Sequence, residues 1–223
     1  MNLQGELLPS DLYGLSYLLA LLGLLWVGRR APWAALNDAA KVNAWLGASI
    51  VIGAVWLLKA GVRPNLHLHL LGATALTLMV GPYFALLGLA LVLVAVTWLG
   101  IGDWQNLPVN WLLMAWIPVW VSHGLLRLCQ RRLPANYFIY IFINAFIGGA
   151  LAMLATGAAA GLFHWLAGTY GADVLLEEYL PFYLLLAFSE AFSTGMALTS
   201  FVIYRPQWVM TFDDALYLRK RDS

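Results

Sequence analysis

The sequence is poor in cysteine and in charge. Its 223 residues include one cysteine, Cys129, and 10% charged residues, with a formal net charge of +1. A lone thiol forms no internal disulfide and no cysteine-rich metal cage, so any metal would be held by nitrogen or oxygen ligands. So few charges cannot coat a soluble surface, and a net charge near zero does not attract a polyanion. These absences exclude a water-soluble enzyme and a nucleic-acid-binding protein.

Several common motifs are also absent. The sequence has no P-loop, no GxGxxG turn and no kinase motifs, so ATP-driven work is expected on another subunit. The residues before the first apolar run include Glu6 and Asp11 and no basic cluster, unlike a secretory signal peptide. We therefore expect the first apolar run to be an uncleaved helix and Met1 to remain at the mature N-terminus.

What the sequence has is apolar residues, at 62% of the chain and a mean hydropathy of +0.79. A membrane-spanning helix needs about 20 apolar residues. Charged residues, Pro and Gly divide the apolar sequence into runs of about this length. The pattern predicts an all-α polytopic membrane protein with one transmembrane domain over residues 1–223. A tight turn is expected at Gly81-Pro82. The seven predicted spans are Leu12–Gly28, Val42–Ala60, Leu66–Val80, Tyr83–Gly100, Val109–Leu128, Tyr137–Ala167 and Tyr179–Tyr204.

Basic residues predict the orientation, because Lys and Arg accumulate in cytoplasmic loops. Most follow spans 1, 5 and 7, whereas acids gather in the other loops. We therefore expect residues 1–11 outside and a cytoplasmic tail over residues 205–223, in a bacterial inner membrane. Span 6 is longer than one crossing requires, and it contains a possible bend at Gly148-Gly149 and a GxxxG pattern, Gly157 and Gly161, typical of closely packed helices.

Polar side chains inside a membrane are costly, so each is a functional candidate. Candidates on the outer side are His67, His69, His164 and Asp103. Glu190 is predicted near mid-membrane, either protonated and structural or supporting a buried group. His123, beside Arg127 near the inner end of span 5, is interpreted as interfacial.

The His67-Leu68-His69 pair depends on the local backbone. On a regular helix, two side chains that are two positions apart point about 200° away from each other. Both histidines could therefore bind one ion only if this part of the chain is extended. His69 is the better candidate for the bundle interior, because small residues follow it on the same helical face.

Three stretches and their order carry a family resemblance. They are His69-Leu-Leu-Gly72 with Thr77-Leu-Met-Val-Gly81-Pro82, Asn106-Leu-Pro-Val-Asn110 with Met114, and Glu190 with Thr194. Pro9 also sits where the N-terminal motif of the family ends. Together they resemble the membrane-embedded substrate-binding component of energy-coupling-factor cobalt/nickel importers, the CbiM/NikM type. The resemblance covers most of the chain.

The resemblance implies a metal site made by the Met1 amine, by backbone and ring nitrogens of the second residue, and by His69. Such a near-planar nitrogen set suits Ni²⁺ or Co²⁺. The second residue here is Asn2 instead of His, so the chain is a divergent member. His67, joined by His164 or Asp103, could instead complete a His-rich tetrahedral site that favours zinc; alternatively, metal binding is lost. Asn110 and Glu190, together with Asn2 and Asp103, are interpreted as groups that support the ligands.

The resulting hypothesis is a permease component for uptake of nickel, cobalt or zinc, captured near the outer face and passed inward. It is not an enzyme. The resemblance implies separate ATPase subunits and a coupling transmembrane subunit as partners, with membrane lipid around the chain. The alternatives are a membrane-embedded metalloenzyme or metal-site assembly factor, with Asp103 or Glu190 as its acid or base, and a scaffold subunit that has lost the site.

Overall fold

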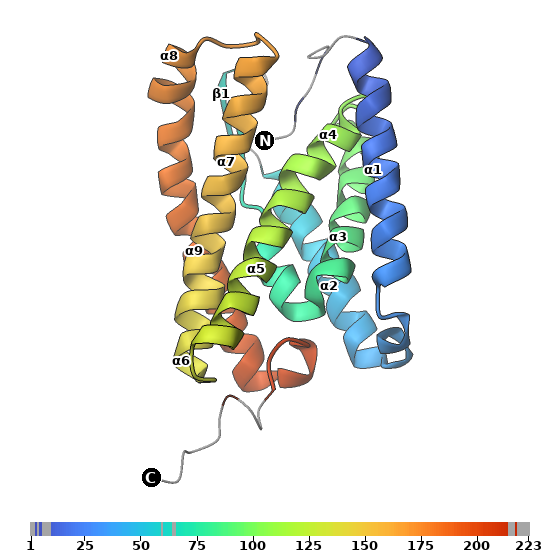
Figure 1. Ribbon diagram of the computed structural model, residues 1–223, viewed down its shortest axis with the longest axis vertical. Coiled ribbons are helices and arrows are strands. Elements are labelled where there is room, and N and C mark those ends of the chain that lie inside the picture. Colours follow the sequence, from blue (N-terminus) through green and yellow to red (C-terminus); the bar gives the residue numbers. More distant parts are fainter. Residues whose placement is uncertain are drawn as a thin grey trace.

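The computed structural model describes residues 3, 5, 10–58, 60–63, 66–213 and 217. Within them, six helices are long and apolar enough to span a membrane. They lie side by side as a bundle, with the start of α1 and the end of α9 at opposite ends (Figure 1). The helical, multi-pass membrane fold expected from hydropathy is confirmed.

The elements follow one another along the bundle with short connections. The first half contains α1 (Ser10–Arg30), the 3₁₀ turn η1 (Trp33–Asn37), α2 (Ala39–Leu57), the antiparallel strands β1 (Ala60–Arg63) and β2 (Leu66–Leu68), and α3 (Ala73–Trp98). The second half contains α4 (Leu107–Trp111), η2 (Leu112–Trp116), α5 (Ile117–Arg132), α6 (Tyr137–Ile139), η3 (Tyr140–Ile147), α7 (Gly148–Leu166), α8 (Ala172–Val174), η4 (Leu175–Tyr179), α9 (Leu180–Tyr204) and η5 (Pro206–Trp208).

Three of the long helices contain π-helical turns. The segments η2, η3 and η4 have this wider winding and are continuous with α5, α7 and α9, respectively. The π-turns of η3 end where α7 begins at Gly148. The bend considered at Gly148-Gly149 therefore coincides with a change of helical winding, which is one recognised cause of helix bending.

Helix α3 is a helical hairpin. Gly81 has φ 78° and ψ 168°, which are not helical values. A Cβ on Gly88 would lie 3.2 Å from a methyl group of Leu76, twelve positions earlier, whereas those positions in a straight helix are about 18 Å apart. The chain therefore reverses at Gly81-Pro82, as the sequence predicted.

The region before this turn differs from the prediction. A helix was expected from Leu66, but Leu66–Leu68 is a strand and helical structure begins at Ala73. The helical part before Gly81, residues 73–80, is only about 12 Å long. Leu66 and Leu68 are buried, and β2 pairs with β1, so backbone groups of this extended segment have hydrogen-bond partners. The described residues thus contain six long helices, where seven separate spans were expected.

Helices α7 and α9 pack closely through glycines. A Cβ on Gly149 would lie 3.2 Å from the carbonyl oxygen of Glu190, and one on Gly161 would lie 3.3 Å from Leu180. A Cβ on Gly157 would overlap the ring of Tyr183. The predicted GxxxG pattern therefore closes the bundle of this chain itself.

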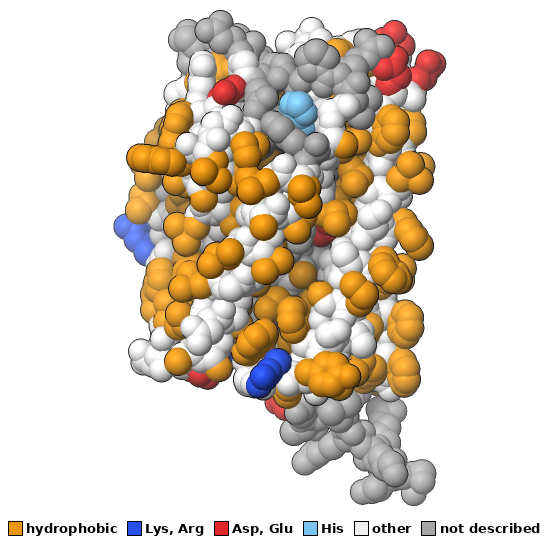
Figure 2. Space-filling view, turned by 180° about the vertical axis from the view of Figure 1, so that it is seen from behind, with side chains coloured by type: hydrophobic (Ala, Val, Ile, Leu, Met, Phe, Trp, Pro, Cys, Tyr) orange, Lys and Arg blue, Asp and Glu red, His pale blue; other side chains and the backbone are white. Residues whose placement is uncertain are grey.

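Charge is unevenly distributed over the molecule. Helices α1, α5 and α9 end at the same lower face (Figure 1), and the first two end in Arg29-Arg30 and Arg131-Arg132. The π-turn at the start of the last long helix instead carries Glu177 and Glu178. Apolar side chains cover much of the height between (Figure 2).

Candidate functional site

Asn110 anchors Leu3 inside one end of the bundle. Leu3 is fully buried. Its backbone N–H donates to Asn110 Oδ1 at 2.8 Å, and its carbonyl oxygen accepts from Asn110 Nδ2 at 3.2 Å. One side chain thus satisfies both backbone groups of a residue that has lost its contact with water.

Gly5 is held by three further side chains. Its N–H donates to an oxygen of Asp103 at 2.5 Å, and its carbonyl oxygen accepts from Asn106 Nδ2 at 2.8 Å. The Tyr13 hydroxyl donates to the same Gly5 carbonyl oxygen at 3.4 Å. Asp103, Asn106 and Asn110 are spaced by three and four residues around the start of α4, so they form one polar row. Met1 and Asn2, predicted as a ligand and its neighbour, lie outside the described residues.

His69 is buried, 4% exposed, directly after β2. Its Nδ1 lies 2.8 Å from the carbonyl oxygen of Leu70. A carbonyl oxygen only accepts, so Nδ1 is the donor and the neutral ring carries its lone pair on Nε2. This is the tautomer that can bind a metal through Nε2.

Trp56 holds the His69 segment from the side of α2. The indole ring lies 5.2 Å from the imidazole, centroid to centroid, and its N–H donates to the carbonyl oxygen of Leu71 at 3.1 Å. Sequence reasoning did not identify this residue, because a tryptophan near the end of a span looks like an interfacial anchor.

Glu190 holds the same segment from the side of α9. Its two carboxylate oxygens accept from the backbone N–H groups of Leu71 and Gly72, each at 2.8 Å. The carboxylate therefore sits at the N-terminus of α3, where the helix dipole favours negative charge. Gly72 has φ +66°, and a Cβ there would lie 2.8 Å from Ile52. Of the two interpretations of Glu190, this geometry favours the supporting one.

The two other candidate histidines, His67 and His164, have different surroundings. His67 is half-buried in β2, opposite Gly61 of β1. His164 is fully buried against Phe163, Tyr170 and Tyr179. Neither of its ring nitrogens has a hydrogen-bond partner among the described residues. Within that part of the chain, no three His, Cys, Asp or Glu side chains form a group able to hold a metal ion.

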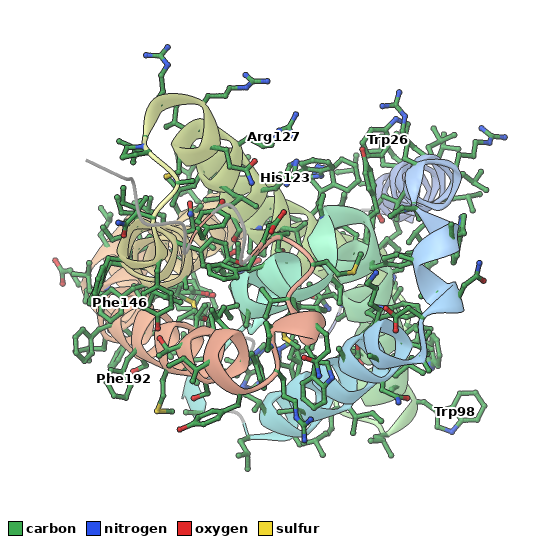
Figure 3. The ribbon with its side chains drawn as sticks, turned by 90° about the horizontal axis from the view of Figure 1, so that it is seen from below. Trp26, Trp98, His123, Arg127, Phe146 and Phe192 are labelled. Atoms are coloured by element: carbon green, nitrogen blue, oxygen red, sulfur yellow. The ribbon has the colours of Figure 1, made fainter. Side chains whose placement is uncertain are left out.

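His123 lies away from these residues. Figure 3 shows His123 and Arg127 together on the outer side of α5. The imidazole is half-buried and packs against Trp120 with ring centroids 5.6 Å apart. The interfacial interpretation of His123 stays a prediction.

Comparison with known proteins identifies one family. The family model described as "Cobalt uptake substrate-specific transmembrane region", CbiM, matches residues 2–208. A comparison with curated proteins gives no significant match.

Two solved structures have the same fold. The crystal structure of a transition metal transporter superposes with a TM-score of 0.78 at 20% sequence identity, covering 91% of this chain and 93% of the other. That of a truncated transition metal transporter gives 0.78 at 21% identity, covering 92% and 99% of the two chains. At these identities the likeness shows a shared fold.

Proposed function

Because the chain belongs to the family of cobalt-uptake substrate-specific transmembrane regions, CbiM, and is a membrane component for transition-metal uptake, we propose that it captures nickel or cobalt at the end of the bundle where Leu3 is docked. The observation that carries this proposal is the anchoring of Leu3 by Asn110 at 2.8 and 3.2 Å. Fixing the backbone of Leu3 also restricts the positions of the two residues before it, as is required if they supply metal ligands.

The reach of the chain limits where those ligands lie. Two residues span at most about 7 Å, so nitrogen donors of Met1 and Asn2 stay within that distance of the buried Leu3 position. His69 supplies an imidazole whose Nδ1 already donates a hydrogen bond to the carbonyl oxygen of Leu70, which leaves Nε2 to bind the metal. The proposed ligands are the Met1 amine, the backbone of Asn2 and His69 Nε2.

Asn2 replaces the imidazole of the family motif, so a further nitrogen is required. His164, buried with two ring nitrogens that have no partner in the described chain, is one candidate, and His67 is the other. An all-nitrogen set made of an amine, a backbone group and imidazoles favours Ni²⁺ or Co²⁺, and a tetrahedral set with more imidazoles favours Zn²⁺.

Four polar side chains support the proposed ligands. Asp103, Asn106 and Asn110 hold the backbone of the N-terminal segment, and Glu190 holds the loop that carries His69. In this proposal these four side chains do not bind the metal. Their role is to fix ligand orientation, which in metal sites is worth roughly 10- to 100-fold in affinity.

The arginine distribution supports an orientation for uptake. We assign the end of the bundle at which α1, α5 and α9 terminate to the cytoplasm, since cytoplasmic ends are rich in Arg. Leu3 then lies toward the outside of a bacterial inner membrane, in a chain that crosses it seven times when β2 and the first arm of α3 together count as one crossing and the second arm of α3 as another. The proposed partners are separate ATPase subunits and a coupling transmembrane subunit.

Elemental analysis of the detergent-purified protein tests the proposal. The wild type is equilibrated with equal nickel, cobalt, zinc and copper beside His69→Ala, His67→Ala and His164→Ala, with His123→Ala as the matched histidine control. We expect near-stoichiometric nickel or cobalt in the wild type and in His123→Ala, and its loss in His69→Ala. Unchanged metal in a folded His69→Ala protein contradicts the site.

The N-terminal amine is tested separately. One alanine added before Met1 removes the amine from its place and leaves every side chain present, so we expect metal to be lost without a change in folding. Stoichiometric zinc in place of nickel or cobalt would point to the His-rich site. No metal in any protein would favour the scaffold alternative, with Asn2 as its cause.

A further inference from the structure

A lateral groove of about 520 Å³ opens on the face between α2 and α9. Helix α3 packs against both of these helices, and residues of its first arm line the groove with them. The groove is lined by apolar and small side chains over several turns, among them Ala48, Ile52 and Ala197. Figure 2 shows this face of the molecule, with an acidic group recessed among apolar side chains.

Two polar side chains of the groove, Glu190 and Ser193, are already hydrogen-bonded. Both carboxylate oxygens of Glu190 accept backbone N–H groups, and the Ser193 hydroxyl donates to the Glu190 carbonyl oxygen at 3.2 Å. Water would therefore gain few hydrogen bonds along this surface. Because the groove lies on membrane-spanning helices, hydrocarbon is the solvent next to it.

Two kinds of molecule could occupy the groove, a lipid chain or a helix of another subunit. The lining is almost entirely apolar and the groove opens sideways on membrane-spanning helices, so a hydrocarbon chain can enter it from the bilayer. The charge at one end of the groove distinguishes the two occupants.

A positive charge lies at one end of the groove. Trp208 lines that end, and the guanidinium of the exposed Arg205 lies 5.9 Å from the centre of its ring. No ion pair to Arg205 occurs within the described part of the chain, where the recorded pair joins Lys41 and Asp38. An arginine and a tryptophan at a helix end are placed to meet a lipid headgroup.

We propose that this groove binds one anionic phospholipid, with an acyl chain between α2 and α9 and its phosphate on Arg205. The acyl chain supports the first arm of α3 along the side that α2 and α9 leave uncovered. It thereby contacts the helix whose N-terminus is held by Glu190, beside the loop that carries His69.

Native mass spectrometry of the full chain tests this proposal, with phosphatidylglycerol and phosphatidylethanolamine as probes. We expect the wild type to retain about one phosphatidylglycerol. Ala48→Phe and Ala197→Phe fill the groove from opposite walls and should reduce retention at least fivefold. Two walls are used so that a folding failure in one variant leaves the other. Ala158→Phe, on the exposed side of α7, is the matched control and should retain lipid.

The headgroup contact has its own matched control. Arg205→Gln should lose the preference for phosphatidylglycerol over phosphatidylethanolamine. Arg30→Gln should keep that preference, although Arg30 also stacks on a tryptophan, Trp26, at 5.4 Å. Equal lipid retention in folded groove-filled variants, or an unchanged preference in Arg205→Gln, overturns the proposal. So does normal lipid retention together with loss of a co-purifying transmembrane subunit, which would identify a helix-docking groove.

Discussion

Asn110 pairs with the backbone of Leu3 as a neighbouring β-strand would. Its amide oxygen accepts the Leu3 N–H and its amide nitrogen donates to the Leu3 carbonyl oxygen, across 107 positions of sequence. Of the 20 amino acids, only Asn and Gln carry a neutral side-chain amide that offers this donor and acceptor together. Aspartate has no donor at neutral pH, so it satisfies only half of the pair.

Replacing Asn110 by alanine is predicted to weaken metal binding at least tenfold. The change removes both bonds and leaves two buried backbone groups of Leu3 unpaired, at a cost of about 1–3 kcal/mol each. Isothermal titration with the retained metal measures the affinity, and thermal unfolding in detergent measures stability.

Asn136→Ala is the control for this prediction. Asn136 caps α6 by accepting the Phe138 N–H at 2.7 Å on an exposed part of the chain. Its loss should cost about 0.5–2 kcal/mol of stability and leave metal affinity unchanged. Equal affinities in the two variants would show that docking of Leu3 has no part in metal binding.

Glu190→Gln is predicted to destabilise the protein and to weaken metal binding. The carboxylate accepts from both Leu71 and Gly72, whereas an amide offers one oxygen and turns an N–H₂ group toward the other backbone donor. One buried N–H is left unpaired, which costs about 1–3 kcal/mol. The exposed Glu177→Gln is the control for charge alone. If both variants unfold at the wild-type temperature, Glu190 does not hold this loop.

Two features of the fold could be predicted from short sequence patterns because the physics is local. Gly81-Pro82 ends one helix and begins another, since Pro82 lacks a backbone N–H and Gly81 adopts φ 78°. Gly157 and Gly161 predicted close helix packing, since a missing side chain allows backbones to approach. The sequence did not indicate which helix packs on these two glycines; in the structure it is α9.

The segment around His69 could not be predicted in the same way. Leu66 to Val80 is mostly apolar, and a short apolar run does not distinguish strand from helix. Whether His67-Leu68-His69 is helical or extended was left open by the sequence. The contact of Glu190 with Leu71 joins residues 119 positions apart, so it depends on tertiary packing that no local pattern encodes.

Gly157→Ala is predicted to disrupt the packing of α7 on α9. The added Cβ overlaps the buried ring of Tyr183, whose hydroxyl is also bonded to that of Tyr179 at 2.7 Å. Overpacking of this kind costs about 1–3 kcal/mol. Gly124→Ala in α5, where a Cβ meets nothing within 4 Å, should instead stabilise by about 0.5–1 kcal/mol. The measurement is unfolding temperature in detergent, and equal temperatures would contradict the close packing of α7 on α9.

Gly81→Ala separates backbone strain from packing. A Cβ at Gly81 has nothing within 4 Å, so no neighbour must move. The cost comes only from placing an L residue at φ 78° and ψ 168°, a region used almost only by glycine, and we expect about 1–3 kcal/mol. Gly28→Ala in α1 is equally uncrowded but helical, so it should be neutral or stabilising.

Gly81→Ala is therefore expected to unfold below the wild-type temperature, and Gly28→Ala at or above it. The same pair also bears on the metal site. Gly81 is the turn at the far end of the arm that begins after Gly72, so a displaced turn would shift the N–H groups bound by Glu190. We expect Gly81→Ala to lower metal affinity as well as stability. Lower stability with wild-type affinity would show that the His69 loop is held by Trp56 and Glu190 regardless of the turn.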